Sequence, residues 1–112
     1  LHDSHRRQRQ MCIRDRWQRA MIGHSASNQI PVIASNRIGT EKGIDIENYF
    51  YGRSFVTNHV GDKIAEGSRD KEEVLIGKIN LSEAETLRNV WGVFRDRRPE
   101  LYKGLLNLDG SE

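Results

Sequence analysis

The sequence of 112 residues predicts an α/β chain that is one domain or a part of one. Apolar side chains recur at helical spacing near the start and near the end of the chain. Between these regions lie short runs that are rich in β-branched and aromatic residues, as in strands. The expected order is helix, strand, hairpin, strand, helix, helix. Because charged residues make up 30% and hydrophobic residues 36%, we expect a thin core.

Helical spacing begins at residue 17, and it predicts a helix over residues 17–28. Asn28 is expected to end this helix, because asparagine tolerates the left-handed conformation. Residues 30–35 form a short apolar run that predicts a strand buried on both faces. Residues 40–47 are polar and contain glycine, so we expect a loop there. The larger side chains on one face of the first helix are Trp17, Ala20, Met21 and His24.

Three further strands are predicted in the middle of the chain. Residues 50–57 are rich in aromatic and β-branched side chains and predict a strand. Residues 58–62 have the composition of a hairpin turn, and residues 63–66 predict the short strand that returns from it. After a charged turn, residues 73–79 predict another strand.

Two helices are predicted to close the chain. Ser82, followed by Glu85 three residues later, forms a capping box that satisfies two backbone donors at a helix start. Pro99 suits the first position of a last short helix. The apolar stripe of the longer helix consists of Leu87, Val90, Trp91 and Phe94. The apolar side of the short helix consists of Leu101, Tyr102, Leu105 and Leu106.

Positive charge is concentrated in residues 1–16. The net charge is +2, but the first sixteen residues carry five arginines against two aspartates, whereas the other 96 residues hold 13 basic and 14 acidic side chains. A nucleic-acid-binding function therefore rests on this arm alone. Residues 10–16 resemble the in-frame translation of a transposase adapter used to build sequencing libraries. We therefore expect residues 1–16 to be a foreign or disordered segment outside the fold.

Few residues have the spacing of a catalytic or metal site. The four histidines show neither HxxxH nor HExxH spacing, and the single cysteine, Cys12, excludes both an internal disulfide and a CxxC zinc motif. Residues 39–43 lack the spacing of a phosphate loop, and Ser54 lacks the second glycine of a nucleophile elbow. No run of membrane-spanning length and no signal peptide is recognised. We expect a cytoplasmic protein with no metal, no cofactor, and neither a nucleic acid nor a membrane as partner.

Four segments of the chain carry a family resemblance. Residues 17–28 (WQR, then GH and N), 30–39 (IPVIASNRIG) and 50–66 resemble a helix, strand and hairpin of the carbon–nitrogen hydrolase (nitrilase) superfamily. Residues 91–110 (WGVFRDRRPELYKGLLNLDG) resemble the tail of the branch that hydrolyses N-carbamoylputrescine. The resemblance implies that residues 17–112 are the C-terminal, incomplete part of a four-layer α-β-β-α sandwich.

The resemblance also implies an activity. The superfamily uses a glutamate base, a cysteine nucleophile and a lysine that stabilises the oxyanion, and all three lie upstream of the matched segments. It implies a fragment of an amidase that converts N-carbamoylputrescine to putrescine, carbon dioxide and ammonia, without catalytic residues of its own. Cys12 is not expected to be the nucleophile. Two alternatives stay open: another amide or nitrile substrate, and a small basic nucleic-acid-binding protein that uses residues 6–16.

The run Arg95-Asp96-Arg97-Arg98 has three interpretations. It can bind a phosphate or carboxylate, form a solvated junction, or clasp a second subunit. The neighbouring aromatic residues favour the clasp, because arginine beside aromatics is typical of interface anchors. The resemblance implies that family members associate through such tails. We therefore expect a homo-oligomer whose interface includes Trp91, Arg95, Arg97, Arg98 and Tyr102.

Overall fold

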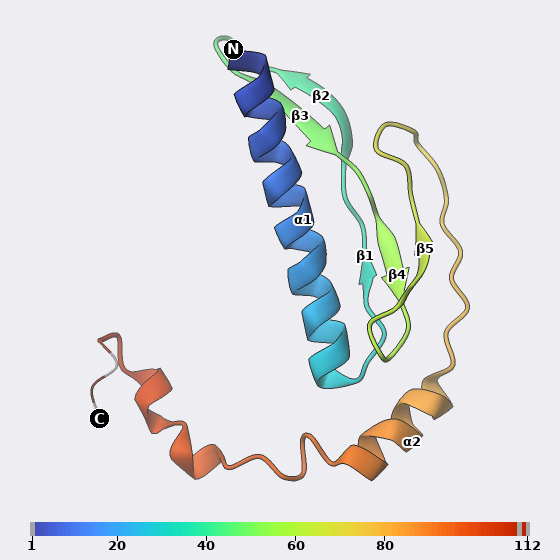
Figure 1. Ribbon diagram of the computed structural model, residues 1–112, viewed down its shortest axis with the longest axis vertical. Helices are drawn as coiled ribbons and strands as arrows, with labels where there is room; N and C mark the ends of the chain where they lie inside the picture. The colour runs from blue at the N-terminus through green and yellow to red at the C-terminus, as the bar shows by residue number, and fades with distance from the viewer. Residues whose placement is uncertain (1, 110, 112) are drawn as a thin grey trace.

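The computed structural model describes residues 2–109 and 111, with the side chains of residue 13 and of residues from 15 onward. Within these residues there are two α-helices, five strands and two 3₁₀-helices (Figure 1). None of the described helices combines the length and the apolar character that a membrane crossing needs. The elements are α1 (His2–Asn28), β1 (Ile33–Ala34), β2 (Ile38–Lys42), β3 (Glu47–Tyr51), β4 (Phe55–Thr57), β5 (Lys63–Glu66), α2 (Leu81–Trp91), η1 (Pro99–Leu101) and η2 (Lys103–Leu106).

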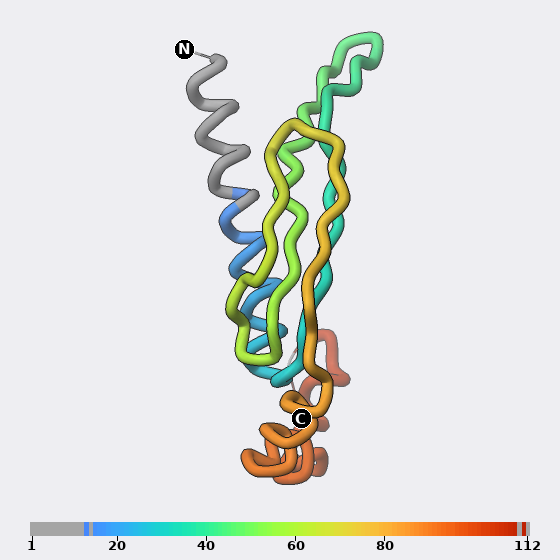
Figure 2. Tube along the Cα trace, turned by 90° about the vertical axis from the view of Figure 1, so that its right-hand side faces the viewer, coloured from blue at the N-terminus to red at the C-terminus, as the bar shows by residue number. Residues whose placement is uncertain are grey.

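The body of the molecule consists of α1 laid against one face of an antiparallel sheet with the order β1-β4-β5 (Figures 1 and 2). In the central strand, Phe55 is fully buried. The indole of Trp17 meets the Phe55 ring edge-on, with ring centroids 5.4 Å apart. Edge-on contact is a favoured arrangement of aromatic rings. This contact joins the helix to the middle of the sheet.

The opposite face of the sheet is covered by an extended stretch of chain, residues 67–80, that runs along it (Figure 2). A β-carbon built on Gly77 would lie 2.8 Å from Cγ1 of Val56 in β4. Only glycine lets the backbone approach the strand so closely. The body therefore has three layers: the helix, the sheet and this extended segment.

Few apolar side chains are buried, and the thin core expected from the composition is confirmed. The radius of gyration is 18.7 Å, whereas a compact domain of this length has a radius of ~13 Å. Figure 1 shows the reason, since α2 and the residues after it leave the sheet and form an arm that passes below the end of α1. The buried apolar residues among those described are Ala34, Phe55, Val56 and Ala84.

The first helix begins earlier than the sequence predicted. α1 starts at His2 and not at Trp17. Residues 2–16 contain no glycine or proline, and arginine and glutamine are good helix formers, so nothing in this stretch stops the helix. The foreign origin of residues 1–16 stays a prediction, because helical structure carries no information about the origin of a sequence.

The end of α1 at Asn28 is confirmed, although the left-handed residue is the next one. Gln29 has a φ of 53°, and the N–H of Ile30 donates to the carbonyl of Ser25 at 3.2 Å, which closes the helix end. The buried face of the helix also differs from the prediction. Ser25 is fully buried, whereas His24 is exposed.

The predicted loop over residues 40–47 is confirmed only at residues 43–46, and the residues on either side of this turn lie in strands. β2 and β3 form an antiparallel hairpin that pairs from Ile38 with Tyr51 to Lys42 with Glu47. The N–H of Gly43 donates to the carbonyl of Ile46 at 2.6 Å across the turn. Most side chains of this hairpin are exposed. Its composition is therefore that of a loop, while the strands arise from backbone pairing with each other.

The predicted strand over residues 50–57 is divided in two. Between Tyr51 and Phe55 the chain turns, and Gly52 and Arg53 both lie in the left-handed region, with φ of 59° and 63°. A β-carbon on Gly52 would lie 2.7 Å from the carbonyl oxygen of Ser68, so this turn requires glycine. The hairpin that follows, with its turn over residues 58–62 and the strand β5, is confirmed.

Two predicted strands are shorter or unpaired. In the run 30–35 only Ile33 and Ala34 pair with β4, and Ile33 is exposed while Ala34 is buried. This run is therefore not buried on both faces. Residues 73–79 are extended, but no strand among the described residues pairs with them. A strand needs a neighbour for its backbone groups, which a local pattern of side chains does not supply.

The helix α2 is confirmed, but its cap is not Ser82. Asn80 is the N-cap, and its side-chain oxygen accepts hydrogen bonds from the N–H groups of Ser82 (3.1 Å) and Glu83 (3.3 Å). The helix ends at Trp91, and Gly92 in the left-handed conformation closes it. An asparagine one residue before the helix performs the function that the capping box assigned to Ser82.

The short helix predicted at Pro99 is confirmed as the 3₁₀-helix η1. Phe94 lies beyond the end of α2, so it does not extend the apolar stripe of that helix. The large apolar residues of the tail are exposed. Those of the two 3₁₀-helices are Leu101, Leu105 and Leu106, and Tyr102 between the helices is exposed as well.

Replacing the cap residue, Asn80→Ala, is expected to lower the free energy of unfolding by about 1 kcal/mol, because two N–H groups lose their acceptor. Urea denaturation followed by circular dichroism measures this change. The matched control is Ser82→Ala, which leaves the Asn80 acceptor in place and is expected to cost less than about 0.5 kcal/mol. A larger loss for Ser82→Ala than for Asn80→Ala would restore the capping-box interpretation.

Candidate functional site

Two buried hydroxyl groups join α1 to the sheet. The hydroxyl of Thr57 donates to Oγ of Ser25 at 2.9 Å, and the N–H of Val32 donates to Thr57 Oγ1 at 3.0 Å. Oγ of Ser25 lies 2.8 Å from the carbonyl oxygen of Ile30 and 2.9 Å from that of Asn58. Since a hydroxyl carries one proton, it serves one carbonyl at a time. Both hydroxyls are committed to backbone groups, so neither is a free nucleophile.

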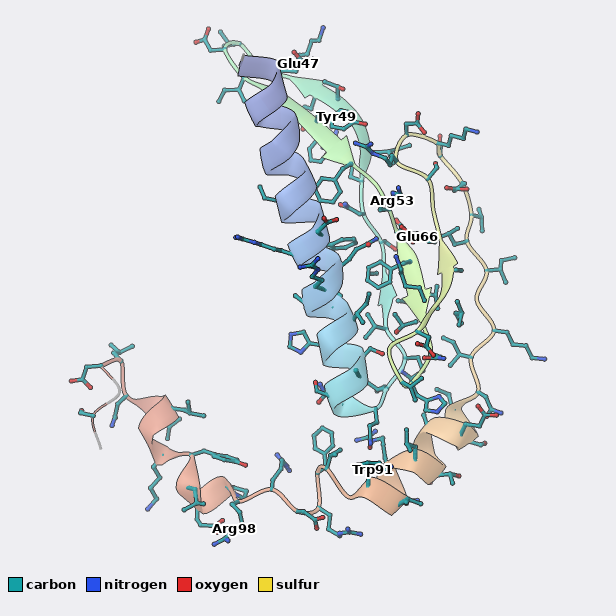
Figure 3. The ribbon with its side chains drawn as sticks, viewed as in Figure 1. Glu47, Tyr49, Arg53, Glu66, Trp91 and Arg98 are labelled. Carbon is teal, nitrogen blue, oxygen red and sulfur yellow. The ribbon has the colours of Figure 1, made fainter. Side chains whose placement is uncertain are left out.

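A polar cluster lies further along the same face, between α1 and the edge of the sheet. Glu66 in β5 pairs with Lys63 at 2.6 Å and with Arg53 at 3.0 Å. Gln18 of α1 donates to the carbonyl of Arg53 at 3.3 Å and to Glu66 Oε1 at 3.4 Å, and its own oxygen accepts from Lys63 at 3.4 Å. Figure 3 labels Arg53 and Glu66 close to each other beside the sheet.

The carboxylate of Glu66 is held in its ionised form. Burial by itself raises its pKa, but hydrogen bonds from Lys63 and Gln18 and the positive charges of Lys63 and Arg53 lower the pKa below the ordinary value of 4.5. A carboxylate with a lowered pKa and two cationic partners is a poor proton acceptor near neutral pH. The cluster therefore stabilises the helix–sheet contact and is not arranged as an acid–base site.

A second polar contact closes the end of β1 against the turn before β4. The N–H of Asn36 donates to Oγ of Ser54 at 2.8 Å, and its amide group donates to the carbonyl of Gly52 at 2.8 Å. A cavity of about 330 Å³ opens beside this contact and is also lined by Ser68 and Glu73. Glu73 accepts a hydrogen bond from the N–H of Ser68, which lowers its pKa. Among the described residues, no histidine is hydrogen-bonded to Ser54.

The tail carries the residues expected at an interface. The ring of Phe94 is in contact with two guanidinium groups, whose central carbons lie 4.9 Å (Arg88) and 5.1 Å (Arg97) from the ring centroid. The Nε–H of Arg97 donates to the carbonyl of Phe94 at 3.0 Å. Trp91 is 67% exposed at the end of α2. These contacts stiffen the segment through cation–π attraction and leave the indole uncovered.

The other arginines of the tail have partners of their own. Arg95 pairs with Asp96 at 2.9 Å, and its hydrogen bond lowers the pKa of that carboxyl. Arg98 pairs with Glu100, and its N–H donates to the Tyr102 hydroxyl at 3.4 Å. Figure 3 shows Trp91 and Arg98 apart from each other along the arm. The structure thus places all five predicted interface residues on one extended segment without gathering them into a cluster.

A groove of about 520 Å³ separates α2 from the loop that follows α1. Ile30 and Pro31 form one wall, and the other wall is mixed, with the apolar Leu81, Ala84 and Phe94 beside the charged Glu85, Arg88 and Arg95. Among the described residues, no group of three or more histidine, cysteine, aspartate or glutamate side chains is arranged to hold a metal ion. Cys12 lies on α1, and its side chain is outside the described part of the chain.

The sequence interpretation missed the polar contacts that hold the body together. Ser25 follows Trp17 and Met21 at successive intervals of four, so the helical period alone places it on their face. Large side chains mark the predicted face, and serine is too small to be among them. The pairing of Glu66 with Gln18, which is 48 residues away, has no local signal in the sequence.

Comparisons with known proteins give a consistent result. The profile of the family described as "Carbon-nitrogen hydrolase" matches residues 6–89. The chain is 52% identical over 89 residues to a citrullinase of Francisella tularensis, which covers 80% of this chain and 31% of that protein. It is 47% identical over 103 residues to an N-carbamoylputrescine amidase of Solanum tuberosum, which covers 88% of this chain and 34% of that protein.

The comparison of this structure with solved structures gives the same result. The crystal structure of a carbon–nitrogen hydrolase from Helicobacter pylori G27 matches 88% of this chain with a TM-score of 0.80 and 34% identity. The match covers 34% of that chain, and the curated relatives are likewise spanned for about a third of their length. The expected fold class, an incomplete α/β part of this fold, is confirmed.

The polar cluster around Glu66 predicts how stability depends on pH. Because the folded-state pKa lies below that of the unfolded chain, Glu66 stabilises the fold above about pH 4.5, and this contribution is lost as the pH falls through the folded-state pKa. Glu66→Gln is expected to lower the free energy of unfolding at pH 7 by about 0.2–1 kcal/mol and to flatten its loss between pH 6 and pH 3. Urea denaturation at several pH values measures both effects.

The matched control for this prediction is Glu47→Gln at the exposed start of β3. It is expected to leave the pH dependence close to that of the unmodified chain. An unchanged pH profile in Glu66→Gln would contradict the assigned role of the cluster.

Proposed function

The chain belongs to the carbon–nitrogen hydrolase family, and from this premise we propose that it is the C-terminal part of an amidase that hydrolyses N-carbamoylputrescine to putrescine, carbon dioxide and ammonia. The observation that carries the proposal is the 47% identity to the Solanum tuberosum amidase over 88% of this chain. The tail, residues 91–110, which resembles the same branch, adds support. Such a protein acts in the cytoplasm on a small carbamoyl amine.

A second candidate substrate is citrulline, favoured by the 52% identity to the Francisella tularensis citrullinase. Citrulline and N-carbamoylputrescine share a terminal ureido group, and both yield carbon dioxide, ammonia and an amine on hydrolysis. They differ at the other end, since citrulline carries an α-amino acid there and N-carbamoylputrescine a primary amine. The family chemistry is the same for both, so the choice between them rests on groups that bind this other end.

The catalytic groups are proposed to lie in the part of the enzyme that precedes this chain. In the family chemistry a glutamate removes the thiol proton, the thiolate attacks the carbamoyl carbon, and a lysine stabilises the oxyanion. The polar side chains described above fit a supporting role. Ser25 and Thr57 are bonded to backbone groups, Ser54 is bonded to Asn36, and Glu66 is paired with two cations.

The full-length enzyme that contains this chain is expected to release ammonia from N-carbamoylputrescine with a kcat/KM at least about tenfold above that for citrulline. A coupled ammonia assay on both ureido compounds at matched concentrations measures this ratio. A preference for citrulline would select the second candidate, and inactivity on both would contradict a ureido substrate.

The control is the 112-residue chain alone, which is expected to be inactive on both compounds and unaffected by Cys12→Ser. Cys12 lacks a positioned base and an oxyanion donor, which acyl transfer requires. Turnover by the isolated chain that is lost on Cys12→Ser would overturn the assignment of the catalytic groups to another part of the enzyme.

We further propose that the arm from Trp91 onward contributes to a homo-oligomer. The arm extends from the body and carries exposed aromatic side chains close to arginines, and the charges of Arg95 and Arg98 are already paired with Asp96 and Glu100. Aromatic and arginine side chains in this arrangement suit an interface, because little charge has to be newly desolvated. The residues proposed for the contact are Trp91, Arg95, Arg97, Arg98 and Tyr102.

Truncating the full-length enzyme before Trp91 is expected to lower its oligomeric mass by at least half, because the proposed anchors are removed. Light scattering coupled to gel filtration measures the mass. The matched control removes only residues 107–112, which leaves the aromatic and arginine residues in place and is expected to keep the mass unchanged. An unchanged mass after the longer truncation would exclude the arm from the interface.

A further inference from the structure

We draw no further inference here: the strongest candidate, the groove between α2 and the loop that follows α1, carries nothing, because nothing in the described part of the chain shows what covers it.

Discussion

The contact between α1 and β4 determines where every other element of the body lies. Phe55 is buried against the indole of Trp17. Two turns further along the helix, Oγ of Ser25 accepts a hydrogen bond from the hydroxyl of Thr57. The same two hydroxyls bond to the loop after the helix, to Val32 before β1 and to the turn after β4. Because these groups are buried, each lost partner leaves an unsatisfied polar atom, and the helix is thereby held in one register over the sheet.

Polar contacts are important for holding the body together, because few of the described apolar side chains are buried. The cluster of Gln18, Arg53, Lys63 and Glu66 ties the same helix to the edge of the sheet, but its members are partly exposed and each ion pair adds little. The apolar residues that would form a larger core are present on the surface, for example Val74 and Ile76. Large apolar side chains that are usually found inside a domain are thus exposed in this chain, which agrees with its match to about a third of a hydrolase.

The described polar side chains support the structure, and the catalytic groups are proposed to lie in another part of the enzyme. Ser25, Ser54 and Thr57 are hydrogen-bonded to backbone groups and Glu66 is paired with two cations, so these side chains fit a structural role. In the proposed enzyme, this part supplies a sheet covered by a helix and an exposed arm, and the reacting groups are proposed to lie in the part that precedes it. A catalytic site depends on such support, since its residues must be held to within a fraction of an ångström.

The sequence alone determined the elements whose signals are local. The end of α1 at Asn28, the hairpin ending in β5, the helix α2 and the short helix at Pro99 follow from helical periodicity, turn composition and the fixed φ of proline. The family resemblance followed from short motifs in the same way. The tertiary structure alone decided the β2–β3 pairing, the break at Gly52 and Arg53, the unpaired state of residues 73–79 and the partners of Ser25 and Glu66. These features depend on backbone and polar groups that are far apart in the chain, and no periodicity of side chains encodes which of them will meet.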